Sequence, residues 1–230
     1  RCCMSRELPF ENYSWQISQH EIGFDPKISW NLLACAAEFE GQANYNEELN
    51  SLLVERGILT ENVREGKPSP WRDYQQILPE MGLIYSTKLK NQIEITQVGR
   101  AYLNSKISFE EMLTLQFLRY QYPNGQKFQL GEKVKASWSE TSKTIPESLI
   151  EACTLKKVSI RPGYTILRIL FELQKYGISS VSKEQVLNFI LPNKNDSEFE
   201  LSVDEIRNLK PIKNVNSHAR RNISAWFRIL

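Results

Sequence analysis

Apolar positions repeat with a helical period over the first part of the chain, and residues that often begin or end helices flank the periodic segments. Ser29 precedes an apolar segment that predicts a helix over residues 30–39, with Trp30 on its buried side. A second predicted helix begins at Asn46, where leucines follow at helical spacing, and ends at Gly57. Two adjacent helices are therefore expected before residue 60.

A third helix-start signal and an alternating segment come next. Ser69 is placed to cap a helix whose first residue is Pro70, and Gly82 is placed to end it. Residues 83–87 and 92–96 then alternate between apolar and polar side chains around a short turn, which predicts a β-hairpin. This order predicts a winged helix-turn-helix, whose third helix enters the major groove of DNA while the hairpin, or wing, lies beside the backbone.

Two more capped helices follow the hairpin. Thr96 caps a predicted helix over residues 97–103, and Ser108 caps another over 109–119. A Pro-Asn-Gly turn then ends the periodic pattern. Residues 126–160 are rich in lysine and show no clear period, so we expect a linker or an arm laid over a neighbouring unit.

The helical period returns in the last third of the chain. It predicts a helix over residues 164–176, with Leu167 and Phe171 among its buried side chains. Ser182 and Ser202 are each followed three residues later by Gln or Glu, which is the sequence of a capping box, so each is expected to begin a helix.

The final segment parallels the third predicted helix. Ser217 is placed to cap a helix over residues 218–230 that carries arginine near its start, contains a tryptophan and closes on Ile-Leu, as residues 69–78 do. A wing hairpin follows the earlier segment, whereas the sequence stops after this one. We therefore expect a second helix-turn-helix unit that is incomplete at its C-terminus, and a longer parent chain.

The predicted fold class is mainly α-helical with small β-hairpin wings. Two winged helix-turn-helix subdomains are expected, the second of them truncated. Residues 1–125 would form an N-terminal arm and the first subdomain, residues 126–160 the linker or arm, and residues 161–230 the second subdomain.

Composition excludes membrane proteins, disordered chains and secreted disulfide scaffolds. The distribution of charge along the chain bears on the kind of partner. Of the 230 residues 41% are apolar and 24% charged, and no apolar run approaches the roughly 20 residues of a membrane span. The formal net charge is +2, yet residues 1–60 carry 4 basic and 9 acidic side chains, so the basic excess lies downstream. Such a slope indicates a polyanionic partner. The four cysteines lack metal-ligand spacing and are expected to be reduced, as in a cytoplasmic protein.

Candidate DNA contacts are basic and polar side chains on the two recognition segments and the wing. Arginine matches the major-groove edge of guanine, and glutamine that of adenine. The candidates are Arg72, Gln75 and Gln76 on the first recognition helix, and Ser217, His218, Arg220, Arg221, Asn222 and Ser224 on the second. Lys67, Lys88 and Lys90 are expected to contact backbone phosphates. Solvated helix faces and solubilising lysines are the alternative interpretations.

The sequence contains no convincing catalytic constellation. A restriction-type nuclease core needs an acidic residue followed by Asp/Glu-x-Lys on neighbouring strands, so that two carboxylates hold Mg²⁺. The one match, Glu65-Gly66-Lys67, lies in a Gly/Pro-rich connection without flanking apolar strands. We expect no catalytic residue, metal site or cofactor within this segment.

Three segments carry a resemblance to a known family. Residues 93–103 (IEITQVGRAYL) form a wing-to-helix corner, residues 117–125 (FLRYQYPNG) an aromatic Pro-Asn segment, and residues 216–230 begin with NSHARR. Together they resemble the DNA-recognition regions of type II restriction endonucleases, particularly the type IIS enzymes related to FokI and BpuJI.

The resemblance implies a sequence-specific module for double-stranded DNA in the bacterial cytoplasm. The nuclease domain, with its Mg²⁺, would lie elsewhere in the parent chain, which would be a type II site-specific deoxyribonuclease. A homodimer is a possible assembly, and no membrane partner is expected. Two alternatives stay open: a winged-helix transcription regulator or other bacterial defence protein without nuclease activity, and a module that binds other proteins.

Overall fold

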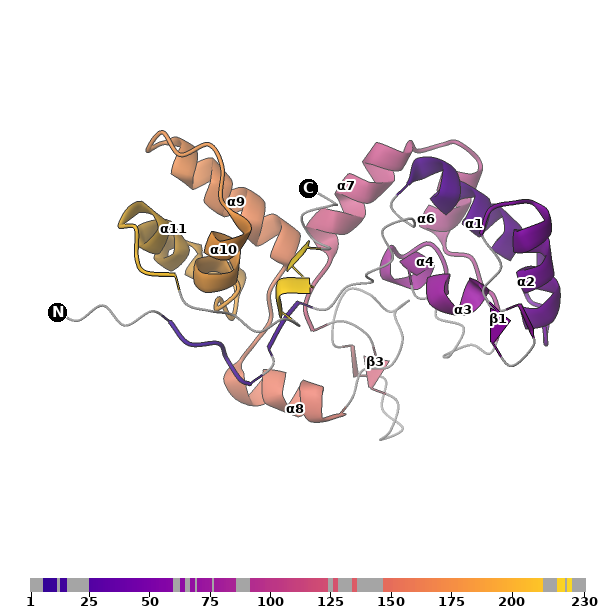
Figure 1. Ribbon diagram of the computed structural model, residues 1–230, viewed down its shortest axis with the longest axis horizontal. Helices are drawn as coiled ribbons and strands as arrows, with labels where there is room; N and C mark the ends of the chain where they lie inside the picture. The colour runs from indigo at the N-terminus through magenta and orange to yellow at the C-terminus, as the bar shows by residue number, and fades with distance from the viewer. Residues whose placement is uncertain are drawn as a thin grey trace.

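The computed structural model describes residues 6–11, 13–15, 25–59, 63–64, 67–68, 70–75, 77–85, 92–123, 126–127, 134–135, 147–212, 219–221 and 223–224. In the short strands, and at positions 72, 73 and 147, this description covers the backbone alone. The described part is mainly helical, as the sequence predicted. Its helices form two groups, with α7 (Phe109–Arg119) between them (Figure 1).

The first group contains the elements from residue 26 to residue 103. They are α1 (Pro26–Glu38), α2 (Asn46–Glu55), β1 (Val63–Arg64), β2 (Lys67–Pro68), α3 (Pro70–Tyr74), α4 (Ile77–Glu80) and α6 (Gln97–Leu103). The strands β1 and β2 pair in antiparallel register, Val63 with Pro68 and Arg64 with Lys67. Lys67 of the Glu65-x-Lys67 match thus lies in a short strand ladder that the sequence did not predict, while Glu65 lies outside the described residues.

Helix α1 begins earlier than predicted, and its buried side does not include Trp30. Its N-cap is Asp25, whose Oδ1 accepts a hydrogen bond from the Ile28 backbone N–H at 2.9 Å. Ser29, the predicted cap, is a buried residue within the helix. Trp30 is 39% exposed, so its predicted place in the core is wrong. The buried side chains of α1 are those of Ser29, Leu32, Leu33, Cys35 and Ala36.

The base of the predicted hairpin is present in the first group. Ile84 and Ile95 form an antiparallel bridge, and the Tyr85 backbone N–H donates to the Glu94 carbonyl at 2.9 Å. Residues 86–91, where the wing tip is predicted, lie outside the described residues.

The second group follows α7. It contains β3 (Gln126–Lys127), β4 (Val134–Lys135), α8 (Glu147–Lys156), α9 (Pro162–Gln174), α10 (Lys183–Gln185), the π-helical turn η2 (Val186–Ile190), the 3-10 turn η3 (Asp196–Glu198) and α11 (Phe199–Arg207). Strands β3 and β4 pair in antiparallel register. The sequence predicted no helix within residues 126–160, yet α8 lies there and buries Ile150 and Cys153.

Two hydrophobic clusters stabilise the two groups, and α7 belongs to both. Met112, in its N-terminal half, packs with residues of α1, α2 and α4 in the first cluster. Phe117, in its C-terminal half, packs in the second cluster with Ile166 and Ile169 of α9. Because both clusters use one continuous helix, α7 connects the two groups physically.

The N-terminal segment packs against the second group, although the first group follows it in the chain. Tyr13 and Trp15 are fully buried in the second cluster. Arg6 donates from Nε to Glu205 Oε2 at 2.9 Å, and its guanidinium also contacts Asn193, Ser202 and the Phe189 carbonyl. The sequence-based division placed this arm with the first subdomain.

Two predictions for the second group are wrong. Leu167 and Phe171 of α9 were expected to be buried, but they are 41% and 63% exposed. Ser202 was expected to begin a helix, yet α11 begins at Phe199 and Ser202 lies buried within it. The hydroxyl of Ser202 donates to the Phe189 carbonyl at 2.6 Å, so it connects two elements and does not cap one.

Among the residues that the structure describes, none of the helices combines the length and the apolar character that crossing a membrane requires.

Candidate nucleic-acid interface

A side chain of α2 positions the start of the first predicted recognition helix. Asn50 lies on α2, where its Oδ1 accepts a hydrogen bond from the Trp71 backbone N–H at 2.8 Å and its Nδ2 donates to the Asn46 carbonyl at 2.7 Å. Trp71 is 1% exposed and anchors α3 in the first cluster. The predicted helix start at Pro70 is confirmed. Ser69, the predicted cap, lies outside the described residues.

The helix predicted to follow Ser69 is shorter than expected. Helix α3 ends at Tyr74 and α4 begins at Ile77. Pro79 accounts for the break, because in one continuous helix its ring would clash with the carbonyl of Gln75 and its nitrogen could not donate to that carbonyl. Gln75 is half-buried. The Arg72 side chain and Gln76 lie outside the described residues, so their DNA contacts stay predictions.

Contacts around Glu40 hold the return strand of the predicted wing. Its Oε1 accepts hydrogen bonds from the Ile95 backbone N–H at 2.9 Å and from the Arg100 guanidinium at 2.7 Å. Gly99 lies so close to this strand pair that a Cβ on it would be 2.1 Å from the Leu83 carbonyl oxygen. The candidate lysines of this region, Lys67, Lys88 and Lys90, have no described side chains.

The second recognition segment is helical at residues 219–221 and 223–224. Ala219 and Ile223 are fully buried in the second cluster, whereas Arg220 and Arg221 are exposed. In a helix that buries two positions four residues apart, the first and second residues between them point away from the buried side. Ser224, half-buried, donates to the Arg220 carbonyl at 2.8 Å. Of the other candidates, Ser217, His218 and Asn222 lie outside the described residues.

An acidic side chain accompanies Arg220. Its Nη1 donates to Glu184 Oε1 at 2.8 Å, and both side chains are more than 40% exposed. The pKa of Glu184 is lowered, first by its hydrogen bond with its own backbone amide and then by the Arg220 guanidinium. Sequence reasoning missed this pair, because the two residues are 36 positions apart.

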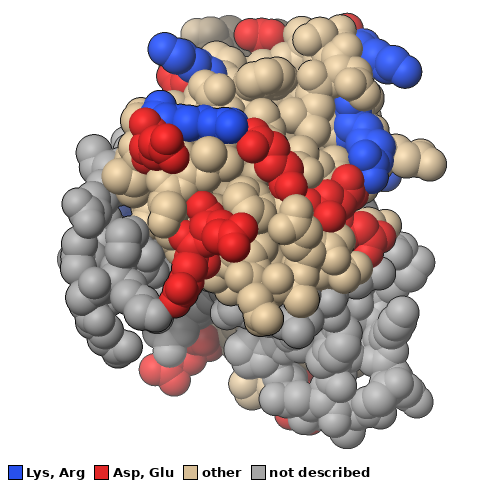
Figure 2. Space-filling view, turned by 90° about the vertical axis from the view of Figure 1, so that its right-hand side faces the viewer, with Lys and Arg blue, Asp and Glu red and all other residues tan. Residues whose placement is uncertain are grey.

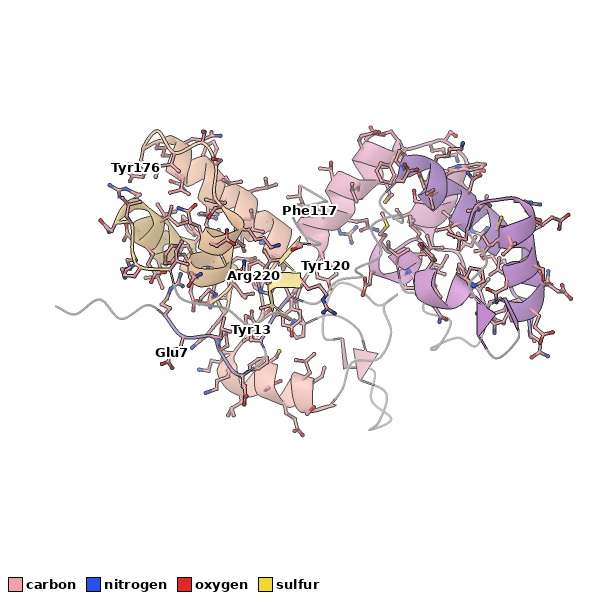
Figure 3. All side chains as sticks on the ribbon, in the orientation of Figure 1. Glu7, Tyr13, Phe117, Tyr120, Tyr176 and Arg220 are labelled. Carbon is pink, nitrogen blue, oxygen red and sulfur yellow. The ribbon has the colours of Figure 1, made fainter. Side chains whose placement is uncertain are left out.

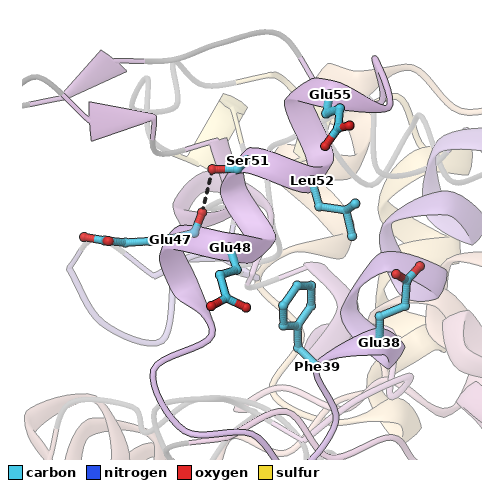
Figure 4. Close-up of a pocket in the computed structure, with 7 residues that line it drawn as sticks. All are labelled: Glu38, Phe39, Glu47, Glu48, Ser51, Leu52 and Glu55. Atoms are coloured by element: carbon cyan, nitrogen blue, oxygen red, sulfur yellow. Dashed lines mark hydrogen bonds between the residues drawn. The ribbon is translucent and has the colours of Figure 1, made fainter.

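The far end of the first group carries an acidic groove between α1 and α2. It has a volume of about 370 Å³, and its lining residues are Glu38, Phe39, Glu47, Glu48, Ser51, Leu52 and Glu55. Figure 4 shows the Phe39 ring between the carboxylates of Glu48 and Glu38. Arg56 pairs with Glu38 through both terminal guanidinium nitrogens, and Nη2 lies 3.0 Å from Oε2.

The acidic groove and the candidate arginines lie at different places in the molecule. Acidic side chains gather on the face that the α1–α2 end presents (Figure 2). In the view of Figure 3, Arg220 lies toward the middle of the molecule, away from the α1–α2 end. A phosphate backbone would avoid the acidic end, because like charges repel. Any duplex must therefore approach from another side.

The buried titratable groups belong to the core. Cys153 is 2% exposed, and burial raises its pKa to about 11, against the lowering effect of its hydrogen bond with Tyr122. Burial also raises the pKa values of Tyr13 and Tyr122 above their ordinary range. Within the described ranges, histidine, cysteine, aspartate and glutamate form no group of three able to hold a metal ion.

Comparison with known proteins adds no assignment. No protein-family model matches the chain, and no curated protein shows significant similarity to it.

Proposed function

We propose that this chain binds double-stranded DNA at specific sequences, as the target-recognition part of a type II restriction endonuclease whose nuclease domain lies elsewhere in the parent protein. The observation that carries DNA binding is the arrangement of the first group: α2 packs on α3 through Asn50, and the Ile84–Ile95 bridge follows α4. This order agrees with that expected of a winged helix and so supports the proposal.

The wing is inferred from what surrounds it. Glu40 and Gly99 hold the return strand against the body. Lys88 and Lys90, which the sequence assigns to the tip of the wing, lie outside the described residues. Lysines in such a segment would neutralise phosphates, while side chains of the first recognition helix would reach base edges.

The second group would supply a second contact through Arg220 and Arg221. Both are exposed while Ala219 and Ile223 anchor their segment in the core, so the arginines are held on a packed support. Arg220 lies away from the acidic α1–α2 end (Figure 3), which favours phosphate binding on this side. The restriction-enzyme assignment rests on the resemblance of residues 93–103, 117–125 and 216–230.

Selection from random duplexes with the purified chain tests the proposal. We expect one enriched sequence, bound with an affinity that falls as salt rises, because binding releases counterions from the DNA. Arg221→Ala should weaken binding by about 1–3 kcal/mol and reduce the salt slope by about one unit. Lys27→Ala, an exposed cation near the start of α1, is the matched control and should change neither quantity.

Two outcomes would contradict the proposal at different levels. If the purified chain retains no duplex even at low salt, DNA binding is contradicted and a protein-interaction module is favoured. Specific binding, combined with a parent chain that does not cut its target when supplied with Mg²⁺, would favour a winged-helix regulator and contradict the restriction assignment.

A further inference from the structure

Helix α9 presents an apolar and cationic face to solvent. Leu167 and Phe171 are 41% and 63% exposed and lie one helical turn apart, on the same side of the helix. Arg168 and Lys175 are exposed on that side as well. The opposite side of α9 packs in the core through Ile166, Ile169 and Leu173. Helix α9 is thus apolar on two faces, only one of which the described residues cover.

Helix α11 exposes two carboxylates and a leucine on its outer face. Leu201 is 49% exposed, and Glu200 and Asp204 are exposed beside it. Val203 and Ile206 turn inward to the second cluster. The outer face of α11 therefore offers one apolar side chain beside two carboxylates, of which that of Asp204 lies 3.7 Å from the exposed Arg207.

The two faces are contiguous, because α9 and α11 lie side by side and run in the same direction. The Arg168 guanidinium lies 4.0 Å from the centre of the Phe199 ring, and the Arg207 guanidinium lies 3.5 Å from the centre of the Tyr176 ring. Both pairs join residues 31 positions apart, so residue n of α9 is level with residue n+31 of α11. Glu200 is then level with residue 169, Leu201 with 170 and Asp204 with 173.

We propose that this face, formed by the outer sides of α9 and α11, is a two-fold interface between two copies of the chain. In an isologous dimer the same surface of each copy must complement itself. A two-fold axis that lies in the face and runs parallel to the helices places α9 of one copy over α11 of its partner and leaves every residue at its own height.

That placement brings opposite charges and apolar groups together. Arg168 meets Glu200 of the partner copy, and Phe171 meets Leu201 of the partner copy, each within about one residue rise of 1.5 Å along the axis. Lys175 lies in height between Asp204 and Arg207 of the partner copy, and these two residues are 3.7 Å apart within that copy, so this position adds little net attraction. Each contact occurs twice.

The alternative arrangements fit the charges less well. A two-fold axis perpendicular to the helices would pack α9 against α9 of the partner copy. Arg168 and Lys175 would then face the same two cations of the partner copy, so like charges would meet. Nucleic acid would meet Glu200 and Asp204, which repel phosphate. Within one copy Lys175 also pairs with Glu172 at 2.6 Å, so this pair must open or be shared when the dimer forms.

Sedimentation equilibrium of the whole chain without DNA, between about 1 and 200 μM, tests the interface. We expect a concentration-dependent dimer for the wild type and at least a tenfold larger dissociation constant for Phe171→Glu. Leu115→Glu, an equally drastic change at a 43% exposed position of α7 outside this face, should leave the dissociation constant unchanged. Circular dichroism should report wild-type helicity for both variants.

A charge exchange tests the register itself. Arg168→Glu and Glu200→Arg should each weaken self-association, because each places like charges together twice. Mixed in equal amounts they should form a heterodimer about as stable as the wild-type dimer, since every contact then joins opposite charges. A wild type that stays monomeric at 200 μM, or a mixture no tighter than its components, would overturn the proposal. Because the measurement needs no DNA, its outcome is independent of the proposed DNA binding.

Discussion

Gly163 of α9 lies directly against Phe117 of α7. A Cβ placed on this glycine would be 2.4 Å from Cε1 of the Phe117 ring and 2.6 Å from the Phe117 carbonyl oxygen. The two helices can cross this closely only because position 163 has no side chain. Since Phe117 belongs to the helix shared by both hydrophobic clusters, this contact fixes how the second group joins α7.

Gly163→Ala should destabilise the protein by about 1–3 kcal/mol, the usual cost of overpacking a core. The sign is informative, because in an open helix interior the same change stabilises by roughly 0.5–1 kcal/mol. Urea unfolding checks the value. Adding Phe117→Leu should recover part of the lost stability, because it removes the ring that the new Cβ would contact. The clash with the carbonyl oxygen of residue 117 would remain. A more stable Gly163→Ala variant would show that the helices separate at little cost.

Arg6→Met should lower the free energy of unfolding by about 3 kcal/mol or more, because it removes the main cation beside the Glu205 carboxylate. Glu205 is only 4% exposed, so its charge would stay buried without that partner. Lys210, 3.5 Å from that carboxylate, compensates only in part. The double variant Arg6→Met with Glu205→Leu should regain most of the loss, since no buried charge is then unpaired. The stabilities of the wild type, the two single variants and the double variant, measured by thermal unfolding, give a double-mutant cycle. Simple additivity would argue against direct coupling.

Asn50→Ala should lower stability by about 1–2 kcal/mol, because it removes the side-chain acceptor at the start of α3. If α3 contacts DNA, the same variant should also weaken specific binding. Asn50→Asp retains an acceptor for the Trp71 N–H and serves as the control, with a smaller loss of both properties. Fluorescence anisotropy with the selected duplex measures the second effect. Equal DNA affinities of Asn50→Ala and the wild type would show that α3 does not contribute to the DNA interface.

Stability should fall as pH rises above 9. Burial raises the pKa of Cys153 to about 11 from its ordinary 9.0, so its thiol contributes stability in full below pH 9. That contribution is lost as pH rises through about 11, because the unfolded chain releases the proton first. The two-unit shift is equivalent to roughly 2–3 kcal/mol. Urea midpoints between pH 8 and 11 should fall less steeply for Cys153→Ala. Parallel curves would exclude this thiol as the cause.

Glu184→Gln should strengthen DNA binding about threefold at low salt, because it removes an anion beside Arg220. Raising the salt should reduce the gain. Glu55→Gln, in the acidic groove of the α1–α2 end, is the matched control and should have a smaller effect. Titration of the selected duplex at two salt concentrations gives both values. A loss of affinity on Glu184→Gln would mean that the ion pair orients Arg220 for binding.

Helix starts with a local chemical cause could be predicted from the sequence. Thr96 accepts from the Gly99 N–H, and Ser108 and Ser182 form capping boxes with the residue three positions later. Each predicted start is confirmed, because a cap and its N–H partner lie within one turn of each other in the chain. The hairpin base at Ile84 and Ile95 was also predictable, since alternation there is local.

Errors arose where distant groups decided the outcome. Ser202 fits a capping box by sequence, but Asn193 and the Phe189 carbonyl engage its hydroxyl inside α11. Trp30 follows a helical period, yet the buried side of α1 is the one that α2 and α6 cover. Of the candidate DNA contacts, the structure places Arg220 and Arg221 at the surface, while many others lie outside the described residues.

The sequence by itself determined that the chain is mainly helical, where most capped helices begin, and where acidic and basic side chains concentrate. These properties depend on neighbours within a few positions. Only the tertiary structure decided that the N-terminal arm packs with the second group through Arg6, that α7 serves both cores, and that Leu167 and Phe171 face solvent. Such contacts join residues far apart in the chain, and a hydrophobic period shows which side chains share a face but not which face another element covers.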